Sequence, residues 1–327
     1  MPISRSDVIS AYRLLLGREP ESEAVVSGWL SSVTSLAQLR QGFLASEEYR
    51  QSNSLLYPSL SGFEPPIEAQ IDSDLSPHAN EALFAHVKKT WTRLGEIDPY
   101  WAVLSAEDYR GRDDPGVIER FYASGAHDVE LLRKTLIRNS ITLPDNATVL
   151  EYGCGLGRVT AHLAQGFRQV IGIDISLPML QAAKRWMEQH AISNVSFQVL
   201  DSLEAIDALP RCDLFFSLIV LQHSPPPIIS RIIRNAVACL NPAGVALFQV
   251  PTYLRNYRFN AREVLSGQAS ATFSAAHQQY EVHAIRQRDL FRIIREAGAS
   301  LIEVIENSML GSDYPGSMSN TLLVQKT

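Results

Sequence analysis

Short apolar runs alternate with amphipathic helical patterns through the second half of the chain. The segment at 226–240, for example, places its apolar residues on one helical face. Strands that alternate with crossover helices are typical of an α/β sheet with mostly parallel strands. The runs that predict strands lie at 148–151, 169–174, 195–200, 213–219 and 245–250.

The sheet pattern ends in a different way from how it begins. An insertion at 251–284 interrupts the alternation, and a helical pattern at 286–297 follows it. Two further strands are predicted at 300–306 and 321–325, joined by a loop. Helices are also predicted at 80–94 and 128–139, ahead of the first strand.

The first 50 residues show a helical pattern of their own. Val8, Tyr12 and Leu15 fall on one helical face, and a second apolar stripe consists of Val25, Val26, Trp29 and Leu30. The spacing Ser35-x-x-Gln is that of a capping box and predicts the start of a third helix. Pro20 suits the first turn of the second helix.

A stretch rich in serine and proline follows these helices and shows no clean period. Its prolines stand at positions 58, 65, 66 and 77. We therefore predict a helical domain at 1–55, a linker at 56–80 and a larger domain at 81–327.

The composition is that of a globular protein and argues against several functional classes. Of 327 residues, 46% are hydrophobic and 20% charged, as in an ordinary globular protein, and the net charge of −6 disfavours nucleic-acid binding. The three cysteines have no C-x-x-C spacing, which indicates reduced thiols and no metal site. Neither a signal peptide nor a membrane-spanning stretch is evident, so we expect a cytoplasmic protein.

A glycine-rich turn at 153–157 carries most of the functional information. The sequence E-x-G-x-G-x-G begins at Glu151, at the end of the first predicted strand, and Gly153, Gly155 and Gly157 follow. Such a turn lets a ligand lie against bare backbone, and the helix after it offers free N–H groups. The dinucleotide fingerprint G-x-G-x-x-G would need a glycine at 158, where this chain has Arg158.

This turn resembles motif I of the class I S-adenosylmethionine-dependent methyltransferases. The last two predicted strands resemble the terminal β-hairpin of that fold, which a regular dehydrogenase domain lacks. The resemblance implies an α/β fold with a Rossmann-like seven-stranded sheet, its last strand antiparallel, beside the small all-α N-terminal domain. It also implies S-adenosyl-L-methionine as cofactor.

Asp174 closes the second strand, 21 residues after Gly153. A carboxylate at that place can accept hydrogen bonds from ribose hydroxyls, in a nicotinamide cofactor as well. The run Ile-Gly-Ile-Asp-Ile-Ser-x-Pro-Met-Leu around it resembles motif II of the methyltransferases. By resemblance, Asp201 and Ser202 lie near the adenine. The full set of predicted cofactor residues is Glu151, Gly153, Gly155, Gly157, Asp174, Ile175, Asp201, Ser202, Ser217 and Leu218.

Two of these carry further expectations. The resemblance places Glu151 below the methionine amino group, and the backbone around Ser217 and Leu218 at the methionine end. Because an unpaired carboxylate near the core would be costly, Glu151 should have a hydrogen-bond donor.

The methyl acceptor should lie near His223, which follows the fourth strand. A histidine there can act as a general base, since its pKa lies near neutrality, although it could instead cap the next helix or only bind substrate. Aromatic-rich segments at 98–104 and 121–125 resemble the lid of related methyltransferases. The candidate substrate residues are Gln222, Tyr253, Tyr280, His283 and Tyr314, a polar aromatic set that suits a sugar but also ordinary surface loops.

The N-terminal segment has a resemblance of its own. The runs A-Y-R-L-L-L-G-R-E-P and F-L-A-S-E-E-Y-R, with Trp29 between them, resemble a small helical domain of unknown function found in polysaccharide-related bacterial proteins. The association of that domain with polysaccharide-related proteins favours O-methylation of a sugar, a glycan or a related small molecule. It also favours a protein partner for this domain. Methylation of a nitrogen or carboxylate, a noncatalytic S-adenosylmethionine-binding module, and a nicotinamide dehydrogenase remain alternatives.

Overall fold

The computed structural model describes residues 3–46, 48–49, 70–71, 74–111, 114–254, 257–267, 280–307 and 317–327. The chain forms two compact units, Met1–Pro66 and Ile67–Thr327, and each is considered by itself. The predicted boundaries at 55 and 80 stay a prediction. Helix α5 (Pro77–Ile97) begins within the stretch predicted as a linker.

The N-terminal unit consists of short helices around a small apolar core. The helices are α1 (Arg5–Ala11), which continues into a π-helical turn at Tyr12–Leu16, α2 (Glu23–Ser32) and α3 (Leu36–Ala45). Trp29 stacks on Phe43 with ring centroids 4.8 Å apart, and the buried side chains are Val8, Tyr12, Val26, Leu39 and Phe43.

Serine side chains cap all three of these helices. Ser35 Oγ accepts a hydrogen bond from the Gln38 backbone at 3.3 Å, as predicted. The reciprocal bond of a capping box is missing, because Gln38 Oε1 accepts from the Thr34 backbone instead. The placement of Pro20 in a first helical turn is wrong, since Ser22 caps α2 and the helix begins at Glu23.

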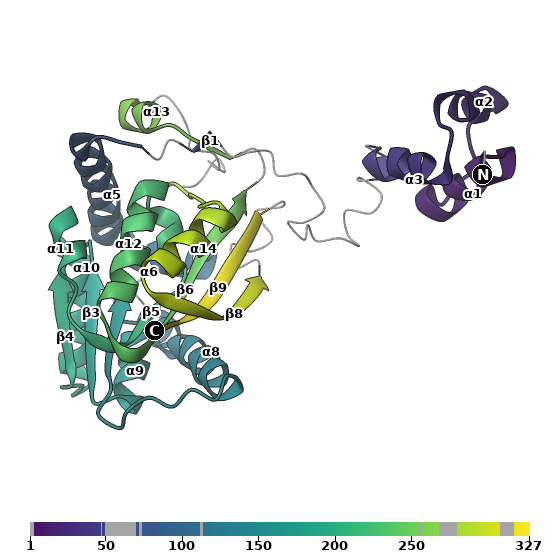
Figure 1. Cartoon of the computed structure of the whole chain (residues 1–327). Coiled ribbons are helices and arrows are strands. Elements are labelled where there is room, and N and C mark those ends of the chain that lie inside the picture. Colours follow the sequence, from purple (N-terminus) through teal and green to yellow (C-terminus); the bar gives the residue numbers. More distant parts are fainter. Residues whose placement is uncertain are drawn as a thin grey trace. The chain divides into compact units, whose positions relative to one another are not determined.

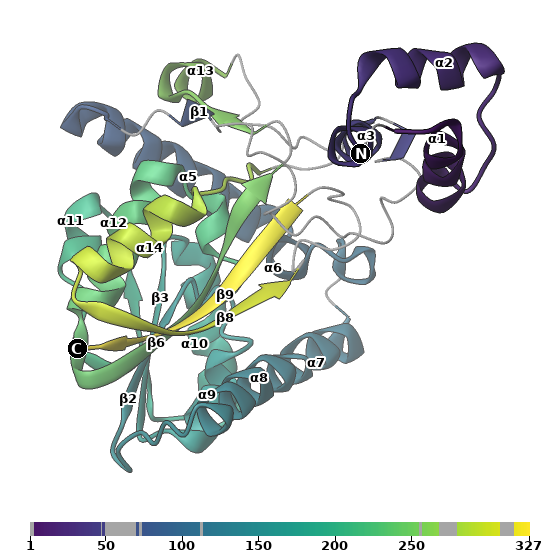
Figure 2. The same cartoon turned by 45° about the vertical axis from the view of Figure 1, so that its right-hand side comes forward.

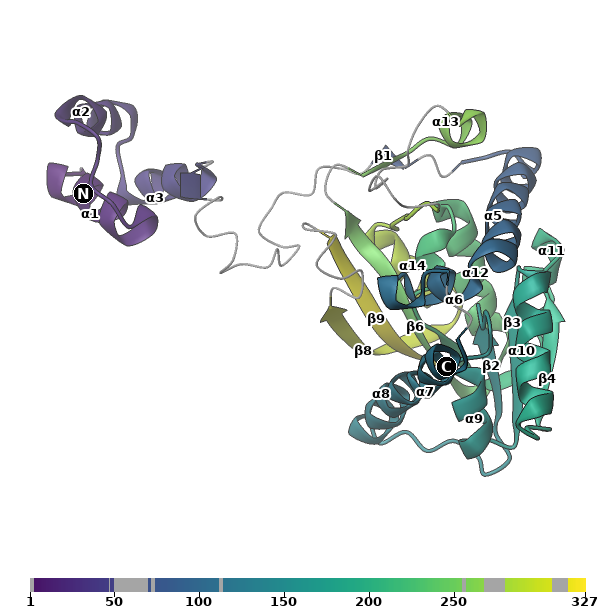
Figure 3. The same ribbon diagram turned by 180° about the vertical axis from the view of Figure 1, so that it is seen from behind.

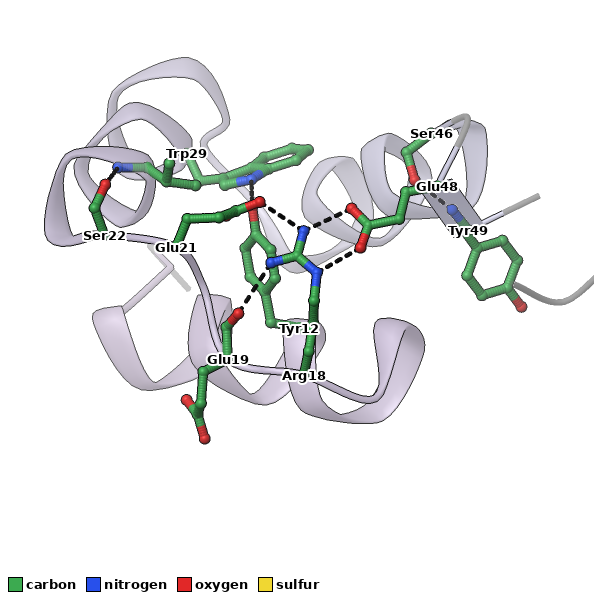
Figure 4. Close-up of polar contacts among 10 residues, drawn as sticks. Tyr12, Arg18, Glu19, Glu21, Ser22, Trp29, Ser46, Glu48 and Tyr49 are labelled. Atoms are coloured by element: carbon green, nitrogen blue, oxygen red, sulfur yellow. Dashed lines mark hydrogen bonds and ion pairs between the residues drawn. The ribbon is translucent and has the colours of Figure 1, made fainter. Parts of the chain in front are cut away.

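A cluster around Arg18 ties this unit together (Figure 4). The guanidinium of Arg18 forms ion pairs with Glu21 and Glu48 and lies 5.0 Å from the centre of the Tyr12 ring. The pairs link the turn after the π-helix to the segment after α3.

The larger unit is built on a seven-stranded sheet in the order β4-β3-β2-β5-β6-β9-β8. The first five strands run parallel, and β9 pairs antiparallel with both β6 and β8. This topology confirms the predicted fold class (Figure 1). The strands are β2 (Thr148–Tyr152), β3 (Gln169–Asp174), β4 (Val195–Val199), β5 (Cys212–Ser217), β6 (Leu240–Leu254), β8 (Ala299–Asn307) and β9 (Ser317–Lys326).

Helices cover both faces of the sheet. On one face α12 (Pro226–Ala238) and α14 (Gln287–Glu296) bury isoleucines and leucines, with the short α11 (Leu203–Asp207) beside them (Figure 1). On the other face lie α8 (Gly125–Arg138), α9 (Thr160–Gly166) and α10 (Leu177–Gln189) (Figure 3). Strands buried on both faces are apolar throughout, which is why the sequence shows them as continuous runs.

Several short elements were not anticipated. Residues Gln70–Ile71 (β1) pair in parallel with Arg258–Phe259 (β7), and α13 (Ala261–Ser266) follows β7 (Figure 2). Two further helices, α6 (Pro99–Leu104) and α7 (Pro115–Ala123), precede the sheet. Among the described residues, no helix is both long enough and apolar enough to cross a membrane.

Candidate functional site

The glycine turn adopts backbone conformations that other residues rarely reach. Gly153, Gly155 and Gly157 have φ angles of 76°, 52° and 79°. The N–H groups of Gly153 and Cys154 both donate to the carbonyl of Ile173, at 2.7 and 3.0 Å, which fixes the turn against β3. The turn therefore presents bare backbone at the carboxyl end of β2.

Close packing adds to the need for glycine here. A Cβ on Gly153 would collide with Val220, and one on Gly157 would lie 2.8 Å from Met187 Cε. At Gly155 a Cβ would come within 3.2 Å of Val103 Cγ2 in α6. Backbone strain thus disfavours larger residues at all three positions, and lack of space excludes them most firmly at Gly153.

Asp174 holds the turn from the end of β3. Its Oδ2 accepts from the Gly155 backbone and its Oδ1 from the Ser176 backbone, each at 2.8 Å. Burial raises the pKa of this carboxyl, while these backbone donors oppose the rise. A carboxylate has about four acceptor sites, so about two stay available for hydroxyl donors.

Glu151 is buried at the end of β2, and it has the donor that the sequence analysis required. Thr160 donates its hydroxyl to Glu151 Oε2. Burial raises the pKa of Glu151 to about 8, against which the Thr160 bond and the nearby Arg158 act in the opposite direction. At neutral pH the side chain is therefore mainly protonated and would ionise readily beside a cationic group.

The remaining predicted cofactor residues are less uniform. Asp201 is exposed, and its carbonyl accepts from Lys88 Nζ at 3.2 Å. Ser202 caps α11 through its hydroxyl, and Ser217 donates to the Tyr152 carbonyl at 2.9 Å. Ile175 is half-buried against the main core, and Leu218 packs on the opposite face of the sheet.

A strained residue follows β5 directly after Leu218. Ile219 has a φ of 59°, an unusual value for a β-branched residue. Its N–H donates to Gln249 Oε1 at 3.1 Å, so the buried amide of β6 holds the strained backbone in place. Sequence reasoning missed Gln249; a polar residue inside an otherwise apolar strand was the available signal.

Helices α5 and α6 lie along the carboxyl ends of the parallel strands. Lys88 reaches Asp201, a Cβ on Gly95 would lie 2.6 Å from Ser176 Oγ, and Val103 faces Gly155. These contacts agree with the lid interpretation of the segment at 98–104, which remains a proposal.

His223 sits in an aromatic setting beside this lid. Its ring centroid lies 4.7 Å from that of Trp91 and 4.9 Å from that of Tyr280. Nδ1 lies 3.1 Å from the Glu281 carbonyl. Because a carbonyl can only accept, the proton of the neutral ring is assigned to Nδ1, and Nε2 keeps the lone pair.

Desolvation lowers the pKa of His223 to about 4. The ring is then neutral at physiological pH, as a base must be, but it does not titrate near neutrality as we expected from the sequence. The alternative that this histidine caps the next helix is wrong, since Pro225 is the N-cap of α12 and, within the described part of the chain, no side chain caps that helix.

The candidate substrate residues lie in different surroundings. Tyr280 contacts His223, whereas Gln222 is buried and its Oε1 has no hydrogen-bond partner among the described residues. Tyr253 lies on β6 opposite Met318. Tyr314 falls outside the described residues.

His283 does not line an open site. Its side chain is fully buried, Nδ1 lies 2.9 Å from the Tyr257 hydroxyl, and Nε2 lies 3.2 Å from Glu281 Oε2. Our expectation that His283 meets the acceptor stays a prediction, since in this structure its side chain contacts Tyr257 and Glu281 instead.

The described residues hold no group of three or more potential metal ligands. All three cysteines are free thiols, and Cys212 Sγ lies 3.7 Å from Cys239 Sγ. A cleft of about 640 Å³ between α11, α12 and α14 is lined by none of the predicted site residues.

Residues 149–244 match the protein family described as "Methyltransferase domain". A ubiquinone biosynthesis O-methyltransferase of Coxiella burnetii is 31% identical over 132 residues, covering 40% of this chain and 54% of that protein. A trans-aconitate 2-methyltransferase of Azoarcus sp. is 34% identical over 121 residues, covering 36% and 43%. The chain spans about half the length of the curated relatives it matches.

Solved structures show the same fold. A magnesium protoporphyrin IX methyltransferase of Synechocystis PCC 6803, with S-adenosylhomocysteine bound, superposes with a TM-score of 0.51 at 18% identity, covering 75% of this chain and all of the other. The cyclase SpnF gives 0.50 at 13% identity, covering 79% and 99%.

The sequence match and the sheet topology agree. The larger unit has a methyltransferase fold, and its residues 149–244 match a methyltransferase domain.

Proposed function

We propose that this chain transfers the methyl group of S-adenosylmethionine to an oxygen of a sugar, a glycan or a related small molecule. One observation carries the proposal: the glycine turn is bare of side chains, and Asp174 is fixed beside it with acceptor sites to spare. That arrangement suits a ligand that carries a ribose.

The residues present fit this cofactor. Gly155 leaves the space that a Cβ would fill, and Asp174 can accept from two ribose hydroxyls. Glu151 is buried and would gain a charge-assisted bond from an ammonium group. When bound, S-adenosylmethionine supplies a methyl group on a positive sulfur, which is already a good leaving group.

The protein must then position the acceptor and remove its proton. His223 is neutral and keeps a lone pair on Nε2, so it can take a proton from a hydroxyl. Trp91 and Tyr280 flank it, and Trp101 lies 6.1 Å from Tyr280 between ring centroids. Such amphipathic aromatic walls suit a ring that carries hydroxyl groups.

The test is transfer of a labelled methyl group from S-adenosylmethionine to a panel of acceptors containing sugars, phenols, amines and carboxylic acids. We expect label on a hydroxylated compound and a loss of turnover in His223→Gln. Label on an amine or a carboxylate would overturn the oxygen acceptor. Tight cofactor binding with no transfer to any of the panel would favour the noncatalytic module.

The N-terminal unit belongs to the same proposal as a docking element for a protein partner. Leu14 is 83% exposed and Leu36 53% exposed, so this unit offers apolar side chains to which a partner could bind. A cytoplasmic location is also proposed, supported by the three free thiols.

A further inference from the structure

Residues 280–285 form a strap that crosses the carboxyl end of the sheet next to His223. The backbone N–H of His283 donates to the Gln222 carbonyl at 2.7 Å, and that of Ile285 to the Pro251 carbonyl at 3.0 Å. The Tyr280 hydroxyl bonds to Ser105 at the end of α6. The strap is thereby joined to the turn that carries His223 and to β6.

A chain of polar side chains fixes the strap from behind. The Tyr257 hydroxyl lies 2.9 Å from His283 Nδ1, His283 Nε2 lies 3.2 Å from Glu281 Oε2, and Glu281 Oε1 lies 3.3 Å from His86 Nε2 in α5. A carboxylate only accepts, so both histidines donate to Glu281. His283 then has to accept from Tyr257, which burial keeps protonated by raising its pKa.

Glu281 also links this series of hydrogen-bonded side chains to His223. The carboxylate of Glu281 is held from two sides, and its carbonyl accepts the Nδ1 proton of His223 at 3.1 Å. If the strap moved, that carbonyl would move with it. The ring would then lose the bond that selects its tautomer.

We propose that Glu281 and His283, with Tyr257 behind them, are positioning residues that hold His223 in the tautomer with its lone pair on Nε2. The proposal rests on methyl transfer with His223 as base, and it assigns a role to two buried side chains, His283 and Tyr257, and to the half-buried Glu281, none of which touches an acceptor. The geometry is that of a general base oriented by a third group.

The test reads the tautomer directly and needs no acceptor. Nitrogen-15 spectra of the histidine-labelled full chain are recorded from pH 5 to 8, and the His223 signals are assigned by their absence in His223→Gln. The wild type should show the tautomer protonated on Nδ1, without titration in this range. Glu281→Gln should show a mixture of tautomers and a titration nearer pH 6.5.

Tyr257→Phe removes one hydroxyl and provides a second test if the Glu281 variant fails to fold. It should also produce a mixture of His223 tautomers, to a smaller extent than Glu281→Gln. Glu306→Gln, which changes an exposed carboxylate on β8, is the matched control and should behave as wild type. Affinity for S-adenosylhomocysteine should stay within about twofold in every variant.

A wild-type ring protonated on Nε2 would overturn the proposal. So would folded Glu281→Gln and Tyr257→Phe variants with wild-type tautomer and titration. Failure of the proposed function is a separate result, since absent methyl transfer would leave the tautomer spectra unchanged.

Discussion

Replacing Glu151 by glutamine should stabilise the free protein while weakening its cofactor binding. The glutamine keeps an acceptor for the Thr160 hydroxyl and removes a carboxyl that burial disfavours in its charged form. A side chain retained for ligand binding at the expense of stability is expected at a functional site.

The size and sign of the stability difference between Glu151→Gln and the wild type follow from the pKa of Glu151. Folding raises the pKa of Glu151 from 4.5 to about 8, so between these values the folded state holds a proton that the unfolded state has lost. The wild type therefore loses stability as pH rises from about 4.5 to 8, by at most about 5 kcal/mol. Glu151→Gln lacks this loss, so its advantage should be near zero at pH 4.5 and largest at pH 8.

Urea unfolding followed by circular dichroism at pH 5, 6.5 and 8 measures the difference. Calorimetry at pH 7 should show S-adenosylhomocysteine bound about 10- to 100-fold more weakly by the variant, the scale of one lost hydrogen bond to a charged group. Glu306→Gln should change neither quantity. A stability difference independent of pH would refute the burial argument, and unchanged affinity would refute the assignment to the cofactor amino group.

Four further expectations follow from the same geometry. Gly155→Val should abolish cofactor binding, because its φ of 52° is strained for valine and its Cβ would lie 3.2 Å from Val103 Cγ2, on the path of the ligand. Asp174→Ala should weaken binding by about 1.5–3 kcal/mol and also lower stability, since two backbone N–H groups lose their acceptor. His223→Ala should lower turnover by about 10²–10⁴ with unchanged cofactor affinity, and the wild type should show no limb at pH 6–7. A chain starting at residue 67 should bind the cofactor as the full chain does, whereas one starting at 80 should bind more weakly, having lost β1 and the cap of α5.

Controls for these variants come from the chain itself. Gly166 has open space around its α-carbon and no positive φ, so Gly166→Val should bind normally. Asp145 is exposed, and Asp145→Ala should leave both stability and affinity intact. If Gly155→Val or Asp174→Ala matched its control in binding, the assignment of that residue would be wrong. A wild-type turnover limb at pH 6–7 that His223→Ala abolished would contradict the lowered pKa of His223.

The strands and the glycine turn were predictable because local pattern determines them. β3 runs from Gln169 to Asp174 as its apolar run indicated, and the three glycines take the left-handed conformations that only glycine adopts easily. The antiparallel position of β9 followed from the resemblance rather than from periodicity.

What depends on distant contacts could not be predicted. Nothing local marks the pairing of β1 with β7, whose partners lie far apart in the sequence. The burial of His283 depends on Tyr257 and Glu281 arriving from an insertion without clear periodicity. The lowered pKa of His223 comes from packing against Trp91 and the strap, which a composition-based reading cannot show.

The central claim, that the glycine turn and Asp174 hold S-adenosylmethionine, is tested most directly by calorimetric titration of the full chain. Titrations with S-adenosylmethionine and with S-adenosylhomocysteine should each show one saturable site, and NAD should give no comparable heat. Tight binding of NAD together with no response to S-adenosylmethionine would contradict the account.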